Sequence, residues 1–273
     1  MQTLCLKIVK LLFNLSDMWY YIASKGFDNM NEKISIYGLS YDNVTLEEAA
    51  EKTDKLLDEE GFHAVITPNA EIAYLAHGEI QLGEIINSAS LVVADGIGVV
   101  YASKIYGTPV KEKVAGVELG ELVLKNAVKT QRKVFFLGAK PGVGELAAKK
   151  LCEKHGKINF VGIRDGYFKN NDEVVDEINK SGAEILFVCL GAPKQEYWIA
   201  ENASKLTNVR LALGLGGALD SWAGTVKRAP KIFIKLGLEW FYRLLKEPWR
   251  FKRMLALPKY IFAVIGDRLK RRK

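Results

Sequence analysis

The chain has 273 residues, 49% of them hydrophobic, which is enough to bury a full α/β core. Its three cysteines and three histidines are scattered, which argues against a disulfide framework or a histidine metal site and is typical of a reducing cytoplasm. The net charge of +7 is uneven, because residues 227–273 carry +12 and the rest of the chain carries −5. This asymmetry predicts an acidic body and a basic tail that meets an anionic partner.

Residues 1–29 are apolar and aromatic, but Lys7, Lys10 and Asp17 interrupt them. The uninterrupted apolar stretches fall short of the ~20 residues that span a bilayer, and no small-residue cleavage site follows an apolar core. We therefore expect neither a spanning helix nor a signal peptide. The segment is interpreted as an extension upstream of a natural start at Met30, with an interfacial helix as the alternative.

Strand and helix patterns alternate from residue 33 onward. Apolar runs predict strands at 33–37, 63–67, 91–95, 133–137, 158–163, 184–190 and 209–213. Helical periodicity and start signals predict helices at 45–60, 70–77, 97–105, 116–128, about 144–155, 172–181 and from 194. The alternation predicts a Rossmann-like, mostly parallel sheet with helices on both faces.

Polar side chains and glycines follow these strands. Asp95 ends one strand and precedes Gly96 and Gly98, which let the chain turn and a ligand approach, while Thr67 and Asn69 follow another strand. Taken singly, Asp95 and Asn69 are better explained as helix caps. Because the carboxyl ends of parallel strands meet at one edge, six such turns converge there and favour a ligand crevice.

Two further turns at this edge carry glycine or polar residues. The segment beginning Gly138-Ala-Lys-Pro-Gly142 resembles a turn that cradles phosphate on backbone amides, although its spacing matches neither the dinucleotide fingerprint nor the P-loop. Gln195 and Glu196 project from a helix start after Pro193, a residue suited to the first turn of a helix.

Residues 227–273 differ in character from the preceding chain. Aromatic side chains alternate with Lys and Arg at helical spacing, and Pro230, Pro248 and Pro258 divide the stretch into pieces too short to span a membrane. The pattern is typical of interfacial helices on an anionic bilayer. Nucleic acid is disfavoured, because phosphate binding needs cations more than buried Leu and Ile. A helix packing its aromatic residues on the core is the other alternative.

The sequence thus predicts three parts: an N-terminal extension (1–29), an α/β core (30–226) and a C-terminal membrane-binding helical appendage (227–273). Ten motifs run through them in one order: Thr67-Pro-Asn69, Asp95-Gly96, Val114-Ala-Gly116, Phe136-Leu-Gly138, Asp165-Gly-Tyr-Phe168, Leu190-Gly-Ala-Pro-Lys-Gln-Glu196, Gly216-Gly-Ala, Ala223-Gly224, Arg228-Ala-Pro230 and Leu238-Glu-Trp-Phe-Tyr-Arg243. Together they resemble the WecG/TagA/CpsF family of bacterial glycosyltransferases over about residues 34–253. At the position before Val-Ala-Gly, where the family has arginine, this chain has Lys113. Lysine keeps the positive charge but cannot bind phosphate through two parallel hydrogen bonds.

The resemblance implies an inverting transfer of N-acetylmannosamine from a UDP-sugar donor to polyprenyl-diphosphate-linked N-acetylglucosamine at the inner face of the cytoplasmic membrane. Asp95 would be the general base. The sequence has no Asp-x-Asp element, so we expect neither a metal nor another cofactor. The resemblance also implies residues that bind the donor. The sugar would be bound by Thr67, Asn69 and Gln195, the diphosphate by Gly138, Lys113, Arg228 and Arg243, and uracil or ribose by Asp220.

Two interpretations from other classes remain at this stage. A sugar-nucleotide dehydrogenase or epimerase that uses NAD agrees with the alternating elements, although no turn has the intact Gly-x-Gly-x-x-Gly spacing. A membrane adaptor without activity agrees with the basic tail but leaves the polar crevice unexplained. The sequence leaves open the exact donor, including the uronic acid of N-acetylmannosamine, and whether the chain forms a homo-oligomer.

Overall fold

The computed structural model describes residues 32–226, 230, 233, 241–242 and 255–271 of the chain. The chain divides into two compact units, 1–31 and 32–273, and the fold described below belongs to the second. Within the described residues, no helix is both long and apolar enough to cross a membrane.

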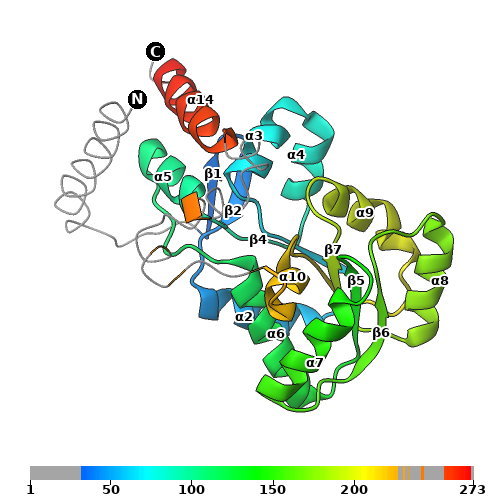
Figure 1. The fold of residues 1–273 in the computed structure, drawn as a ribbon. Helices are drawn as coiled ribbons and strands as arrows, with labels where there is room; N and C mark the ends of the chain where they lie inside the picture. The colour runs from blue at the N-terminus through cyan, green and yellow to red at the C-terminus, as the bar shows by residue number, and fades with distance from the viewer. Residues whose placement is uncertain (1–31, 227–229, 231–232, 234–240, 243–254, 272–273) are drawn as a thin grey trace. The chain divides into compact units, whose positions relative to one another are not determined.

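Six strands form one sheet in the order β4-β3-β8-β7-β5-β6 (Figure 1). They are β3 (His63–Ile66), β4 (Leu91–Val92), β5 (Val134–Gly138), β6 (Phe160–Arg164), β7 (Ile185–Cys189) and β8 (Leu211–Gly214). Every pairing in this sheet is parallel, which confirms the predicted sheet.

The strand predicted at 33–37 lies outside this sheet. It is β1 (Lys33–Ile36), which pairs antiparallel with β2 (Leu39–Asp42) in a separate two-stranded sheet. The two residues between them, Tyr37 and Gly38, have φ of 52° and 89°. Two central residues with positive φ form the tight turn that suits a β-hairpin, so the chain folds back at once and does not enter a helix.

Side chains alternate between the two faces of the parallel sheet, as extended strands require. Leu186 and Val188 of β7 join one core cluster, while Ile185 and Phe187 join the other. The first face is covered by α3 (Ala70–Gly78), α4 (Ile80–Asn87), α5 (Ile97–Tyr106), α8 (Asn171–Ser181) and α9 (Lys194–Asn202). The second is covered by α2 (Leu46–Asp58), α6 (Gly116–Thr130), α7 (Val143–His155) and α10 (Ala218–Ala223). Helices on both faces confirm the predicted α/β class.

A further helix, α14 (Ala256–Lys270), packs against α3 and α5 on the first face (Figure 1). Tyr260 and Val264 of α14 are fully buried, and the Tyr260 ring meets Tyr37 edge-on, with ring centroids 5.6 Å apart. Near the other end of the helix, the Tyr106 hydroxyl donates a hydrogen bond to Asp267. The end of the chain therefore contributes to the core, as the alternative of a packed aromatic helix anticipates, and the appendage as a membrane-binding unit remains a prediction.

Candidate active site at the carboxyl edge of the sheet

A crevice is expected where β3 and β8 end, because these neighbouring strands send their helices to opposite faces. Helix α3, which follows β3, packs on the first face, and α10, which follows β8, packs on the second. Diverging connections of this kind open a crevice at the carboxyl ends of parallel strands. Thr67 is buried at this point, and its Oγ1 donates to the Gly214 carbonyl at 3.2 Å. One side chain thus joins the two strand ends.

Asp95 is half-buried in the turn after β4. Its backbone N–H donates to the Pro68 carbonyl at 3.3 Å, and its Oδ2 accepts a long 3.4 Å bond from the N–H of Gly116, the first residue of α6. A Cβ on Gly116 would lie 2.9 Å from the Thr67 Oγ1. The structure therefore brings Asp95 and Thr67 together around the start of α6.

Asn69 lies beside the same turns and caps α3. Its Oδ1 accepts bonds from the backbone N–H groups of Glu71 (2.9 Å) and Ile72 (3.1 Å). A Cβ on Gly96 would lie 3.7 Å from the Asn69 Cβ, so Asn69 and the Asp95 turn are neighbours. The capping interpretation accounts for the oxygen of Asn69, and its amide nitrogen donates to no described residue.

Gln195, in the first turn of α9, links this helix to the loop after β8. Only 2% of the residue is exposed. Its Oε1 accepts a 2.8 Å bond from the Gly216 N–H, and its Nε2 donates at 3.0 Å to Glu196 Oε1. A Cβ on Gly214 would lie 3.2 Å from the Gln195 Nε2, so the amide lies directly over the end of β8. These contacts fix the amide and leave it one N–H to offer.

Glu196, next to Gln195 in the chain, has surroundings that the sequence does not reveal. The residue is 0% exposed, and its Oε2 makes no hydrogen bond within the described part of the chain. Burial raises the pKa of this carboxyl, against a smaller lowering by the bond from Gln195. Burial therefore disfavours the charged form of Glu196, and its Oε1 orients the amide of Gln195.

Gly138 ends β5 where the chain passes very close to β7. A Cβ at this position would lie 2.3 Å from the Cys189 carbonyl oxygen, and φ is +132°. The next N–H, of Ala139, donates to the same oxygen at 3.2 Å. Only glycine allows this approach. Gly138 thus shapes the turn before α7, and two strands, β8 and β7, lie between β5 and the strand that Thr67 follows.

Several helices begin at this edge without a capping side chain. The N-caps of α5, α6, α7 and α9 make no side-chain hydrogen bond, whereas Asn69 caps α3 and Asn170 caps α8. Uncapped first turns leave backbone N–H groups directed outward and carry the positive end of the helix dipole. The edge is therefore suited to a phosphate-bearing ligand.

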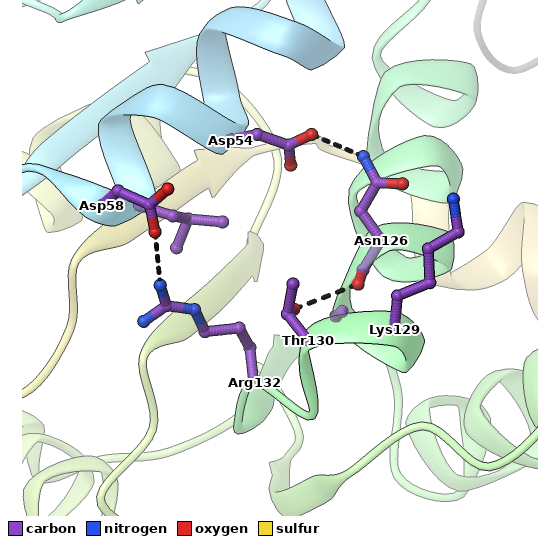
Figure 2. A pocket seen from close by; sticks show the side chains of 8 residues that line it. Asp54, Asp58, Asn126, Lys129, Thr130 and Arg132 are labelled. Carbon is purple, nitrogen blue, oxygen red and sulfur yellow. Dashed lines mark hydrogen bonds and ion pairs between the residues drawn. The ribbon is translucent and has the colours of Figure 1, made fainter.

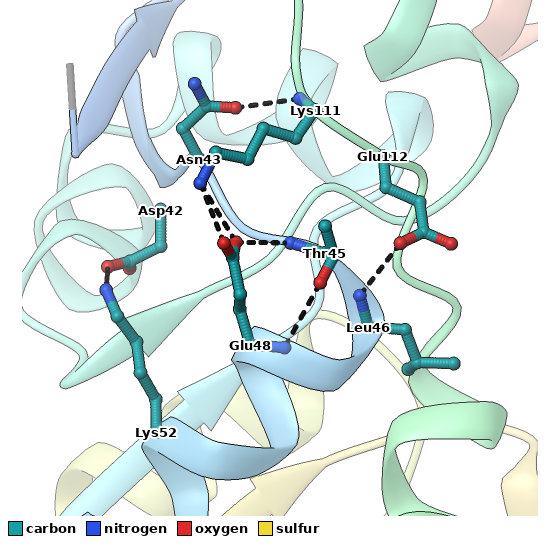
Figure 3. A network of polar contacts seen from close by, with 8 residues as sticks. All are labelled: Asp42, Asn43, Thr45, Leu46, Glu48, Lys52, Lys111 and Glu112. Carbon is teal, nitrogen blue, oxygen red and sulfur yellow. Dashed lines mark hydrogen bonds and ion pairs between the residues drawn. The ribbon is translucent and has the colours of Figure 1, made fainter. Parts of the chain in front are cut away.

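The loop that carries Lys113 is held in place by a polar network (Figure 3). Lys111 donates from its backbone to Asn43 Oδ1 at 2.8 Å and pairs through Nζ with Glu48 at 2.9 Å. Glu112 accepts a 2.9 Å bond from the Leu46 N–H at the start of α2. The next residues lead to the Asp95 turn, because Val114 N–H donates to the Ala94 carbonyl at 3.0 Å. Lys113 is half-buried between these anchors.

The other candidates lie elsewhere. Asp220 is half-buried in α10, and its Oδ1 accepts a 3.2 Å bond from the Thr225 hydroxyl. Arg228 and Arg243 lie outside the described residues. The structure therefore brings Thr67, Asn69, Asp95 and the Lys113 loop together at neighbouring turns, and joins Gln195 to them through the end of β8. Gly138 lies at the end of β5, and Asp220 lies in α10, the helix that follows β8.

A pocket of about 290 Å³ lies at the opposite edge, between α2 and α6 (Figure 2). Its polar groups satisfy one another: Asn126 donates to Asp54 at 2.7 Å, and Arg132 pairs with Asp58 at 2.7 Å. No group of three or more acidic, His or Cys side chains suited to a metal occurs within the described ranges. The carboxyl edge, where several helices begin without a capping side chain and a carboxylate is half-buried, remains the better candidate site.

Comparison with known proteins finds similar sequences in one family of glycosyltransferases. A sequence model described as "Glycosyl transferase WecG/TagA/CpsF family" matches residues 34–273. A Bacillus spizizenii protein named N-acetylglucosaminyldiphosphoundecaprenol N-acetyl-beta-D-mannosaminyltransferase is 39% identical over 209 residues, 77% of this chain and 81% of the relative. Proteins of the same name are 35% identical in Bacillus subtilis (85% of this chain, 91% of the relative) and in Staphylococcus aureus (88% and 95%).

The burial of Glu196 predicts that Glu196→Gln stabilises the folded protein by an amount that depends on pH. Because the pKa is raised in the folded protein, folding of the wild type becomes less favourable as pH rises through the unfolded value of about 4.3. The amide removes this penalty and keeps an acceptor for Gln195. We expect the variant to gain about 1 kcal/mol or more at pH 8, or ~2–4 °C in Tm, and to lose the gain toward pH 4.

Thermal melts of both proteins between pH 4 and 8 measure this difference. Glu201→Gln, at an exposed position of the same helix, is the matched control and is expected to melt like the wild type. An equal Tm for Glu196→Gln and wild type at every pH would contradict a neutral, buried carboxyl.

Proposed function

Because the chain belongs to the WecG/TagA/CpsF family of glycosyltransferases and is therefore a glycosyltransferase, we propose that it transfers N-acetylmannosamine from UDP-N-acetylmannosamine to polyprenyl-diphosphate-linked N-acetylglucosamine. Membership of this family excludes the two alternatives, an NAD-dependent sugar-nucleotide enzyme and a membrane adaptor without activity. The observation that carries the proposal is the half-buried carboxylate of Asp95 beside the start of α6, which Thr67 also approaches. The names of the relatives supply the donor sugar and acceptor.

Asp95 acts as the general base of a single displacement. The acceptor hydroxyl oxygen attacks the anomeric carbon from the face opposite the diphosphate, and its proton passes to the Asp95 carboxylate. The bond between the anomeric carbon and the UDP oxygen breaks with its electron pair on UDP. One displacement inverts the anomeric centre, and a positioned base contributes about 10²–10⁴ in rate.

The negative charge of the leaving UDP is stabilised by backbone N–H groups and cations at this edge of the sheet. Uncapped first turns of α6 and α7, including the glycine turn after Gly138, present backbone N–H groups. Lys113 adds a cation held next to the Asp95 turn, and Arg228 and Arg243 are proposed to add two more. These groups stabilise the leaving diphosphate without a metal ion.

The sugar is oriented by neutral side chains around the base. Asn69 offers its amide nitrogen and Gln195 its second N–H, while the Thr67 hydroxyl, which already donates to Gly214, accepts from a sugar hydroxyl. Asp220 is proposed to accept a hydrogen bond from uracil or ribose. A uronic acid donor of an otherwise similar transferase would need an additional cation near these groups.

A lipid-linked acceptor requires the enzyme to work at the membrane surface, at its inner face where nucleotide sugars are made. Helix α14 supports this, because its outer side exposes Phe262 (74%) and Leu269 (59%) with Lys259 and Lys270 nearby. Apolar side chains flanked by cations are what an interfacial helix uses on anionic lipid. The helix is proposed to bind the bilayer while its inner side stays packed on the core.

The reaction predicts that Asp95→Asn keeps the fold and UDP binding but loses about 10²–10⁴ in turnover, because no carboxylate then takes the acceptor proton. The assay combines UDP-N-acetylmannosamine with a short-chain polyprenyl-diphosphate N-acetylglucosamine and follows UDP release and the disaccharide lipid. Wild-type turnover is expected to persist in excess EDTA.

Asp172→Asn serves as the control for Asp95→Asn, since Asp172 is an exposed carboxylate that pairs only with Lys205 at 3.4 Å among the described residues. Melting curves and UDP titration show that each variant folds and binds. Near-wild-type turnover of Asp95→Asn would remove it as the base, and loss of turnover in EDTA would overturn the metal-free mechanism.

The surface role of α14 predicts that Phe262→Ser with Leu269→Ser weakens binding to phosphatidylglycerol vesicles at least tenfold, because burial of each apolar side chain contributes about 1.5–3 kcal/mol. Turnover on a short-chain soluble acceptor is expected to stay unchanged. Co-sedimentation with vesicles measures the binding, and Leu146→Ser, an exposed apolar position on α7, is the control. Unchanged co-sedimentation of the double variant would refute the assignment.

A further inference from the structure

Helix α14 lies along α5, with the start of each helix near the start of the other. Leu257, in the first turn of α14, meets Gly98, in the first turn of α5. At the far end, Asp267 accepts the hydrogen bond from Tyr106, and a Cβ on Gly107 would lie 3.8 Å from an Arg268 nitrogen. The two helices therefore run side by side in the same direction from the start of α5 to its end, and of these contacts the one made by Leu257 lies nearest the carboxyl edge of the sheet.

The space next to Gly98 is completely filled. A Cβ there would lie 2.5 Å from the Leu257 Cδ1 and 2.6 Å from the Ala70 Cβ. The expectation that Gly98 lets a ligand approach is therefore wrong, because the missing side chain makes room for Leu257 and Ala70. Since Ala70 is the first residue of α3, one leucine side chain lies at the meeting point of three helix starts.

The two turns that precede these helix starts carry the proposed chemistry. Asn69 immediately precedes α3, and Asp95 and Gly96 immediately precede α5. The turns also touch one another directly: the Asp95 N–H donates to the Pro68 carbonyl at 3.3 Å. Any change in the separation of α3 and α5 at Gly98 therefore moves Asp95 relative to Asn69.

We propose that Leu257 is a positioning residue, which sets the distance between the Asn69 and Asp95 turns by packing between the first turns of α3 and α5. The proposal rests on the function proposed for Asp95 and Asn69. A close-packed interior transmits such a contact because a void leaves its lining atoms without partners and lets them shift. A misplacement of about 1 Å at a reacting group is enough to cost ~10²-fold in rate.

Val264 provides a matched control on the same side of α14. It lies two turns beyond Leu257 and is fully buried in the same core cluster, but α14 passes the middle of α5 there, away from both turns. Truncating either residue to alanine leaves a small void under α14. Only the void at Leu257 borders the first turns of α3 and α5.

The test compares Leu257→Ala, Leu257→Met and Val264→Ala in the full chain with the soluble short-chain acceptor. We expect kcat of Leu257→Ala to fall ten- to a hundredfold, with KM for the UDP-sugar changed less than threefold. Leu257→Met, which refills the space, is expected to stay within threefold of wild type. Val264→Ala is expected to lose a comparable amount of Tm and less than threefold in kcat. If Leu257→Ala does not fold, Leu257→Val takes its place, and a smaller decrease in kcat is expected.

Hydrogen exchange gives a readout that does not depend on activity. Amides of residues 68–72 and 95–99 are expected to exchange faster in Leu257→Ala than in Val264→Ala. If the wild type forms no product, the proposed function fails, and the exchange pattern alone decides the positioning of the turns. If wild type is active and the two alanine variants match in kcat and in exchange, the proposal for Leu257 is overturned.

Discussion

The hydrogen bond between the Thr67 hydroxyl and the Gly214 carbonyl marks the constraint on which the site depends, the parallel pairing of β3 with β8. Parallel strands buried on both faces satisfy their backbone groups within the sheet, as the fully buried β5, β7 and β8 show. The first turns of the helices lack intrahelical partners for their N–H groups, and at α5, α6, α7 and α9 no N-cap side chain supplies one. Because the helices after β3 and β8 leave on opposite faces, a crevice is expected between them, next to Asp95 and the loop that carries Lys113.

Local sequence signals predicted the elements well where a capping side chain or a strand pattern defines them. The Thr45 hydroxyl and Glu48 form the expected capping box at 3.2 and 2.9 Å. The hairpin of β1 and β2 escaped prediction because tyrosine occupies a turn position with positive φ, where Asn or Gly would have signalled it. The order of strands in the sheet depends on long-range pairing, to which no local pattern points.

For the candidate site, too, local features could be predicted and long-range contacts could not. The sequence could place Asp95 and Asn69 at strand ends, because each follows an apolar run directly. It could not show that Gln195 commits its oxygen to Gly216 or that Glu196 is buried, since both facts depend on the loop after β8 lying over α9. Gly98 is the sharpest case: its partner Leu257 is far along the chain, so a packing glycine could not be told from one that admits a ligand.

Helix α14 has two roles in these proposals, one through its packing against the core and one through its exposed side. Its inner side, with Tyr260 and Val264, belongs to the core, while Phe262 and Leu269 face away from it. Exposed apolar side chains are unfavourable in water and favourable at a lipid surface. In the proposal, lipid binding therefore stabilises the same helix that packs against α3 and α5. A rigid helix cannot be stabilised on one side alone. On the proposals made above, binding to the acceptor's membrane would also hold Leu257 in place, and with it the separation of the two turns to which the reaction is assigned.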